Sequence, residues 1–312
     1  MYFLPATLLV HLALASFAGY LSAVAAVRLL RIQRAATKSY LFAGALLIPL
    51  GSFVTHLLFS QPCGIYASSG FLLHWACKIG SKIENGGILL ISLSFGIAVS
   101  QVLVSSWATR RALREASPVS DQELRFIPQL REISEKAGIL PPKVFVTRRR
   151  GVLCTVGVLR PSILISSELL ETLDPDEMKA ALAHEIAHIV RNDNVLGTAA
   201  GIVRWLTFFS PVSHFAMNVY LNEREKAADD FAVELTGDHL ALASSIIKVL
   251  KDRRRVLSGE FAGVSFALRE KVSDRIERLL ASKNAVSEGS FTYRLISCVT
   301  IMGMILTILA LC

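Results

Sequence analysis

The chain has 312 residues, of which 53% are hydrophobic, and it carries a formal charge of +8. This combination argues against a soluble globular protein, because the apolar residues form blocks long enough to span a bilayer. The basic excess does not point to direct nucleic-acid binding, since no recognised nucleic-acid motif or pattern of stacking aromatic residues accompanies it. We therefore expect a protein whose partner is a lipid bilayer.

Residues 1–109 are predicted to form three transmembrane helices. The apolar blocks are Leu4–Val27, Tyr40–Phe59 and Gly87–Trp107. The first block has no charged segment ahead of it and is too long for a cleaved signal peptide, so we interpret it as an anchor. A short outer loop, residues 60–86, contains Cys63 and Cys77. An oxidising space would allow a disulfide between them, but the sequence does not decide whether one forms.

Basic residues flank the apolar blocks unevenly and predict the orientation of the chain. The first block is followed by Arg28, Arg31, Arg34 and Lys38, and the third by Arg110, Arg111 and Arg114. Positive residues concentrate on the cytoplasmic side, so both loops should be cytoplasmic. A fourth span is predicted in residues 291–312, around the apolar segment Leu295–Leu311. In the cell (inner) membrane, both termini then lie outside and residues 110–290 form a cytoplasmic domain.

A mostly helical α+β domain is predicted between the third and fourth spans. Its first elements are a juxtamembrane helix, Arg110–Ser117, stopped by Pro118, and a helix, Gln122–Ala137, kinked or divided at Pro128. Three strands follow, at Val144–Thr147, Val152–Val158 and Ser162–Ile165. The segment around Cys154 and Thr155 is the best candidate for an exposed edge to which an extended substrate adds as a strand. Ordinary core strands fit the same pattern about as well.

A capped helix is predicted to begin next. Asp174 suits the N-cap, Pro175 the first helical position, and Glu177 completes a capping box. An apolar stripe with helical spacing follows, made of Met178, Leu182, Ile186 and Ile189.

This helix carries the pattern His184-Glu185-Ile186-Ala187-His188. His184 and His188 are four residues apart and project from one side of the helix, where they offer a divalent metal two neutral nitrogens. Glu185 points about a third of a turn away, where its carboxylate can deprotonate a water without ligating the ion. Surface or core histidines would give the same five-residue pattern, so the prediction of a metal site needs a third ligand.

A second carboxylate cluster, further along the chain, supplies that ligand. Glu225 and Asp229 share a helix face through their four-residue spacing. We predict Glu225 as the third ligand, and Asp229 as the acceptor of an N–H from a ligating histidine. Glu223 competes for the ligand role, but only Glu225 has a carboxylate one turn ahead. A solvated helix face is the alternative for the cluster alone; after the histidine pair, one Zn²⁺ per chain is expected.

Between the two motifs lies a further apolar stretch, Val195–Phe209. A single membrane crossing there would put His188 and Glu225 on opposite sides of the bilayer, where they could not share an ion. We therefore expect a buried, interfacial or re-entrant helix that keeps the metal site near the membrane surface.

A helical tail is predicted from Leu240 to Ser282. Its basic residues are Lys251, Arg253, Arg254, Arg255, Arg269, Lys271, Arg275 and Arg278. We interpret them as residues attracted to anionic cytoplasmic lipid.

Together, residues 184–188 and 224–229 resemble the gluzincin metallopeptidases of membranes. Two branches compete, the BlaR/MecR antibiotic-sensor branch and the HtpX and CAAX prenyl protease branch; residues 157–166, 188–193 and 208–211 are similar to the former. The resemblance implies a gluzincin-type zinc peptidase domain and a further supporting carboxylate at Asp193. It also implies a cytoplasmic or membrane-proximal protein substrate, such as a transcriptional repressor. The penicillin-binding sensor domain is expected to be absent, because the sequence ends at Cys312.

The predicted function is zinc-dependent endopeptidase activity in regulated proteolysis or signalling, with Glu185 as general base. One alternative is HtpX-like quality control of membrane proteins. The other is a non-catalytic signal-transducing scaffold, against which Glu185 argues, because a structural zinc site needs no base. His214 and Arg224 are the nearest candidates for stabilising an oxyanion. The oligomeric state does not follow from the sequence.

Overall fold

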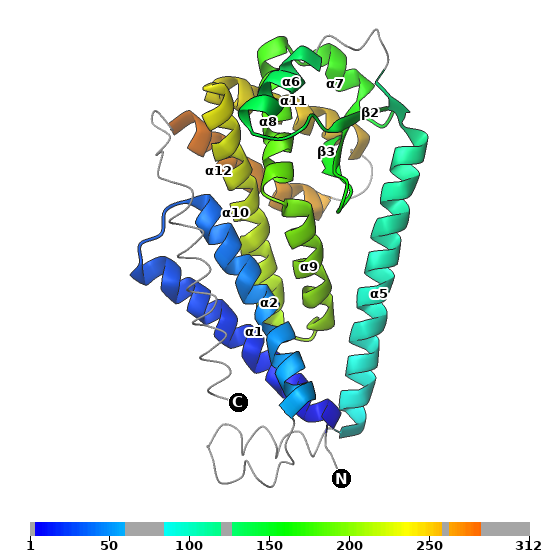
Figure 1. The fold of residues 1–312 in the computed structure, drawn as a ribbon, viewed down its shortest axis with the longest axis vertical. Helices are drawn as coiled ribbons and strands as arrows, with labels where there is room; N and C mark the ends of the chain where they lie inside the picture. The colour runs from blue at the N-terminus through cyan, green and yellow to red at the C-terminus, as the bar shows by residue number, and fades with distance from the viewer. Residues whose placement is uncertain (1–3, 60–83, 120–126, 258–261, 282–312) are drawn as a thin grey trace. The chain divides into compact units, whose positions relative to one another are not determined.

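The computed structural model describes residues 4–59, 84–119, 127–257 and 262–281 (Figure 1). The chain divides into two compact units. The first comprises Met1–Val104, Gly197–Glu223 and Gly289–Cys312, and the second Ser105–Leu196 and Arg224–Glu288. The predicted fourth span, the outer loop up to residue 83, and Cys63 and Cys77 lie outside the described residues.

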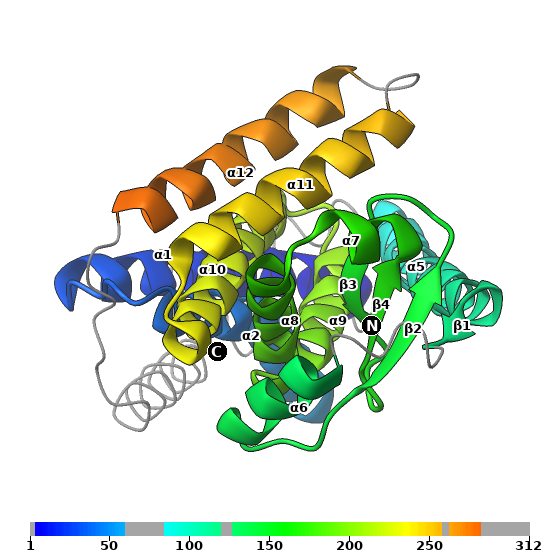
Figure 2. The ribbon, with the colours of Figure 1, turned by 90° about the horizontal axis from the view of Figure 1, so that it is seen from above.

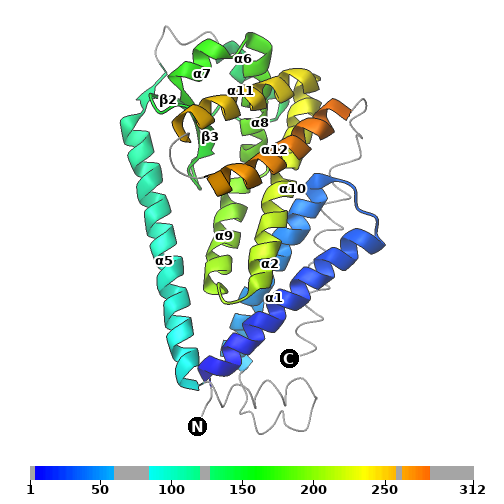
Figure 3. The ribbon, with the colours of Figure 1, turned by 180° about the vertical axis from the view of Figure 1, so that it is seen from behind.

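The first unit is helical. Its helices include α1 (Leu4–Leu29), α2 (Ala35–Phe59) and most of α5 (Glu84–Glu115). Helices α1 and α2 pack side by side (Figure 3). A Cβ added to Gly19 would lie 2.9 Å from the carbonyl oxygen of Ala45, so glycine is needed for the two backbones to come this close.

The three predicted apolar blocks are all helical. Among the described residues, His11–Leu29 and Gly86–Glu115 are long and apolar enough to cross a membrane, and Ala35–Gly51 is a shorter apolar helix. The predicted juxtamembrane helix Arg110–Ser117 is helical as far as Glu115, and it continues the helix of the third apolar block, because α5 runs unbroken between them. No proline or glycine interrupts it after Gly96, and Ser117–Pro118 instead form strand β1.

The apolar stretch Val195–Phe209 forms part of a helical hairpin. Four residues separate the end of helix α9 (Asp193–Leu206) from the beginning of α10 (Pro211–Thr236). At the turn, the hydroxyl of Thr207 donates to the Ser213 hydroxyl at 2.8 Å, and Ser213 contacts Ser16 of α1 at 3.3 Å. These polar contacts satisfy hydroxyls that are buried in an apolar surrounding.

The second unit contains a four-stranded sheet of order β1-β2-β4-β3 (Figure 2). Strand β4 (Ser162–Ser166) is wholly buried, pairs parallel with β2 (Lys143–Thr147) and antiparallel with β3 (Leu153–Val156). The three predicted strands are thus confirmed, with β3 shorter than expected. Strand β3 stands at one edge of the sheet, as predicted for the segment around Cys154 and Thr155.

Helix α8 (Pro175–Val190) runs through the core of this unit and begins with the predicted capping box. The carboxylate of Asp174 accepts the N–H groups of Asp176 and Glu177, while the carboxylate of Glu177 accepts the N–H of Asp174 at 2.9 Å. From Ala180 to His188 every side chain is buried. Polar side chains in this stretch therefore need partners inside the protein.

The remaining helices pack around α8 and the sheet. They are α6 (Ile127–Lys136), α7 (Ser167–Thr172), α11 (His239–Leu257) and α12 (Ala262–Ala281). The core is formed by Ile133, Val146, Ile163, Ile165, Leu182, Ile186, Ala232, Leu242 and their neighbours. Of the predicted helix Gln122–Ala137, residues 122–126 lie outside the described residues; α6 begins at Ile127, so Pro128 lies in its first turn, where a proline is tolerated. The predicted helical tail is two helices, α11 and α12, which lie side by side (Figure 2).

Candidate metal centre

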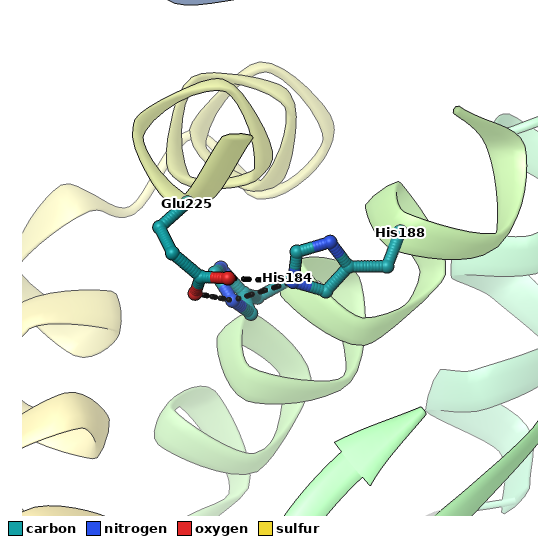
Figure 4. Close-up of side chains that lie close together, drawn as sticks. All are labelled: His184, His188 and Glu225. Atoms are coloured by element: carbon teal, nitrogen blue, oxygen red, sulfur yellow. Dashed lines mark hydrogen bonds and ion pairs between the residues drawn. The ribbon is translucent and has the colours of Figure 1, made fainter. Parts of the chain in front are cut away.

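Two helices bring three side chains of the second unit together (Figure 4). His184 and His188 project from one side of α8, and their Nε2 atoms lie 3.2 Å apart. Glu225 reaches them from α10, with one carboxylate oxygen 3.5 Å from Nε2 of His184 and the other 3.8 Å from Nε2 of His188. Both histidines are buried, and the Glu225 side chain is 28% exposed.

The three side chains fit a zinc ion. Bonds of about 2.0 Å in tetrahedral geometry place ligand atoms about 3.3 Å from one another. The two Nε2 atoms are separated by 3.2 Å, and each lies 3.5 or 3.8 Å from a different oxygen of Glu225, so that one atom from each residue lies within 4.8 Å of the others. Two imidazoles and one carboxylate are also a donor set that zinc accepts.

A buried carboxylate stands behind each histidine. Nδ1 of His184 lies 3.0 Å from Oδ1 of Asp229, and Nδ1 of His188 lies 2.7 Å from Oδ2 of Asp193. Asp229 and Asp193 are 0% and 1% exposed. Each carboxylate favours a proton on Nδ1 of its histidine, which leaves Nε2 as the nitrogen turned towards the other ring and Glu225.

Arg275 of α12 completes this arrangement, and sequence reasoning missed its role. Its guanidinium donates to both oxygens of Asp229, at 2.7 and 2.8 Å, and its Nη1 lies 3.4 Å from Glu225. Arg278 similarly pairs with Asp230 at 2.9 Å. The interpretation of Arg275 as a lipid-attracted residue was therefore wrong, because its guanidinium is bound to the buried carboxylate of Asp229, whereas for Arg278, which pairs with an exposed carboxylate, it stays a prediction. The three-residue spacing of the two arginines, typical of one helix face, was the only signal for a partner helix.

The charges of the site stabilise one another. Burial lowers the pKa of His184, but the carboxylates of Asp229 and Glu225 outweigh it and raise the pKa to about 9. Burial raises the pKa of Asp229, but Arg275 and His184 bring that pKa down to about 2. The pKa of Glu225 is also held well below its usual value, against the effect of burial, by both histidines and Arg275. Without a metal, His184 thus keeps a proton that an ion must displace.

Glu185 is buried beside the histidines and is held by the edge strand. The hydroxyl of Thr155 lies 2.7 Å from Oε2 of Glu185 and 3.1 Å from its main-chain oxygen. Thr155 was predicted only as part of a substrate-binding edge, so this contact with the candidate base was missed. Its neighbour Cys154 is half-buried and lies opposite Leu164 of β4.

The other candidate residues have different surroundings. Nη2 of Arg224 donates to Glu225 at 2.8 Å, so this guanidinium contacts the carboxylate of the predicted third ligand. Nε2 of His214 donates to the carbonyl of Phe208 at 2.9 Å in the turn between α9 and α10. Glu223 is not among the three residues that converge.

One protein-family model matches the part of the chain that contains the metal centre. The family model described as BlaR1 peptidase M56 matches residues 80–279, which is more than half of the chain and contains every residue of the metal centre.

Curated proteins similar to the chain include proteases. The protease HtpX homolog of Pelotomaculum thermopropionicum is 23% identical over 270 residues, covering 69% of this chain and 95% of that protein. Protease HtpX of Pseudomonas entomophila is 27% identical over 237 residues, covering 72% and 79%. The protease HtpX homolog of Herminiimonas arsenicoxydans is 32% identical over 148 residues, covering 44% and 50%.

Proposed function

Because this chain belongs to the BlaR1 peptidase M56 family and is a metalloprotease, we propose that it is a zinc-dependent endopeptidase of the cell membrane. Its substrates are membrane or membrane-proximal proteins. The observation that carries the proposal is the convergence of His184, His188 and Glu225. The carboxylate of Glu185 lies on α8, the helix that carries both histidines.

In the proposed site, His184, His188 and Glu225 hold the ion. When bound, zinc supplies Lewis acidity, which polarises a peptide carbonyl and lowers the pKa of water. Asp229 and Asp193 keep the two imidazoles in the tautomer and orientation that turn Nε2 inwards. Arg275 holds Asp229 through two hydrogen bonds and neutralises its charge in the buried surrounding.

Glu185 is the proposed general base. Its carboxylate takes the proton of the attacking water and returns it to the leaving amine. The hydrogen bond from Thr155 supports this role, because it orients the carboxylate. The Thr155 hydroxyl contacts only one of the two carboxylate oxygens of Glu185, so the other oxygen is available to accept the proton of the attacking water.

Strand β3 is the proposed binding edge for substrate. It pairs with β4 alone among the described strands, and its residue Thr155 contacts Glu185. An extended peptide added to this strand is held through its main chain, with little dependence on its sequence. Such recognition suits a protease that cleaves many proteins.

HtpX-like quality control of membrane proteins is the biological role we favour. The similar curated proteins are named protease HtpX or its homolog, which supports this alternative better than the signalling role predicted first from the sequence. Regulated cleavage of one protein, such as a transcriptional repressor, is the second candidate, and the BlaR1 description of the matching family favours it.

We further propose a multi-pass topology with the metal centre in the cytoplasm. Two described helices are long and apolar enough to cross a membrane, and arginine-rich segments follow the first and third apolar blocks. The α9–α10 hairpin supports a re-entrant segment, because a hairpin returns the chain to the side from which it came.

The test is a comparison of wild type with Glu185→Gln. The purified variant should keep its zinc and lose cleavage of dye-labelled casein, because an amide cannot accept the water's proton. In cells, quantitative proteomics of membranes should show many proteins accumulating with the variant. Accumulation of a single regulator would favour signalling, and near-normal casein cleavage by the variant would remove Glu185 from the role of base.

A further inference from the structure

The open edge of β3 can be deduced from its pairing with β4. Ser166 donates its N–H to the carbonyl of Val152 at 2.8 Å, and the register pairs Cys154 with Leu164. Bonded and non-bonded pairs alternate along an antiparallel ladder, so Cys154, like Val152, turns its N–H and C=O towards β4. Leu153 and Thr155 then turn theirs towards the open edge, where an added strand would bind.

Asn194 lies against this open edge. Its side-chain amide donates to the carbonyl of Gly157 at 2.8 Å and lies 3.4 Å from the carbonyl of Thr155. These are the acceptors at the C-terminal end of the edge. With Asn194 in place, and as far as the described residues go, the groups of the edge left for an incoming main chain are the N–H and C=O of Leu153 and the N–H of Thr155.

The position of Asn194 is fixed by its neighbours in the chain. Asp193, the preceding residue, contacts Nδ1 of His188 at 2.7 Å. Asn192 adopts a left-handed conformation with φ 55°, which asparagine tolerates and which turns the chain from α8 into α9. One short turn therefore contacts both a proposed metal ligand and the proposed substrate strand.

The acceptor side is equally constrained. Gly157 has φ 91°, and a Cβ there would lie 2.7 Å from the carbonyl oxygen of Arg160. Only glycine fits this turn, so the carbonyl that Asn194 binds has a defined direction.

We propose that Asn194 is a specificity-determining residue that ends the substrate-binding edge of β3 beside Thr155. A bound peptide pairs with β3 up to Thr155, whose hydroxyl contacts Glu185, and then leaves the strand next to the base. Residues added to the peptide beyond this point gain no main-chain hydrogen bond from β3. This inference rests on the proposed function.

The experiment measures peptide binding as a function of length. Fluorescently labelled, unstructured peptides from casein are lengthened one residue at a time at either end, and their Kd is measured on the zinc-loaded Glu185→Gln protein. Affinity should rise with length at one end and stop rising at the other. When Asn194→Ala is added to this protein, lengthening the peptide at that second end should again raise its affinity, by about 2- to 10-fold. This is the effect expected of one main-chain hydrogen bond.

Two further variants provide a second substitution of Asn194 and a control. Asn194→Asp keeps the side-chain shape without the amide donor, so it should open the edge in the same way if the alanine variant loses its metal. Gln129→Ala is the matched control, because Gln129 is another amide that donates to a main-chain carbonyl, that of Pro175, at 3.2 Å. It should leave the length dependence unchanged.

The proposal is overturned if both Asn194 variants retain zinc and show the wild-type dependence on length. It is also overturned if they retain zinc and lose peptide binding altogether, because Asn194 would then be a substrate-binding group and not an end stop. Failure of the zinc-loaded protein with Glu185 intact to cleave casein would count against the proposed function instead.

Discussion

The hydroxyl of Thr155 donates to the carboxylate of Glu185 at 2.7 Å, which joins the edge strand of the sheet to the helix that carries both histidines. Thr155 therefore contacts the candidate base and also belongs to the proposed substrate-binding edge of β3. The main chain of Thr155 faces the open edge, while its side chain orients Glu185.

Thr155→Val should therefore lower kcat with little change in KM. Valine has the same shape and leaves the main chain intact, but it removes the donor to Glu185. A hydrogen bond to a charged group is worth about 1.5–3 kcal/mol, so kcat should fall about 10-fold or more. Steady-state cleavage of a quenched peptide gives both constants. Thr155→Ser should restore activity, and full activity in the valine variant would remove Thr155 from a positioning role.

Replacement of the third ligand should empty the metal site. Glu225→Ala removes the carboxylate that lies 3.5 and 3.8 Å from the two Nε2 atoms, whereas Glu223→Ala removes a carboxylate outside the converging group. Zinc per chain, measured by elemental mass spectrometry, should fall close to zero in the first variant and stay at the wild-type value in the second. The opposite result would show that the ligand assignment on α10 is wrong.

Removal of the metal should lower the thermal stability of the wild type. An ion that binds only the folded protein stabilises it according to its free concentration and affinity. Addition of a chelator should therefore lower the unfolding temperature in detergent, and zinc should restore it. The Glu225→Ala variant serves as control, since a protein without the ion should not respond to the chelator. An equal response in both proteins would place the stabilising ion elsewhere.

Loss of Arg275 should destabilise the second unit. Asp229 is fully buried and its charge is matched by Arg275, so Arg275→Leu leaves a buried carboxylate without its strongest partner. Breaking such a pair costs about 3–5 kcal/mol in the free energy of unfolding. Adding Asp229→Asn to that variant should recover part of the loss, as measured by thermal unfolding.

Asp229→Asn alone should weaken metal affinity or activity about 10- to 100-fold, since it removes the charge behind His184. For the Arg275→Leu variant of the preceding test, a stability equal to that of the wild type would show that the ion pair of Arg275 with Asp229 contributes little to the free energy of unfolding.

Reporter fusions test the proposed topology. Fusions at Ser120 and Ser287 should both report the cytoplasm, and one at Ser68 the outer side, because arginines follow the first and third apolar blocks. Labelling of a cysteine placed at Ser68 on intact cells gives an independent check. Opposite sides for Ser120 and Ser287 would contradict the re-entrant hairpin.

Local rules were enough to predict several elements of the site. The capping box of Asp174 and Glu177 and the shared face of His184 and His188 depend on spacings of three and four residues, which one helix determines by itself. The strand around Thr155 followed from its alternating pattern and its flanking turns. The helix predicted before Pro118 is present to Glu115 as the end of α5, because nothing in the intervening residues stops that helix.

The amino-acid sequence by itself determined the histidine pair, the candidate base, the carboxylates of α10 and the apolar blocks, since each depends on residues close together in the chain. Only the tertiary structure decided that Arg275 pairs with Asp229, 46 residues away, that Thr155 holds Glu185 and that Asn194 covers the end of β3. These contacts depend on how separate elements pack around one core, and side-chain spacing along a single helix or strand contains no record of that packing.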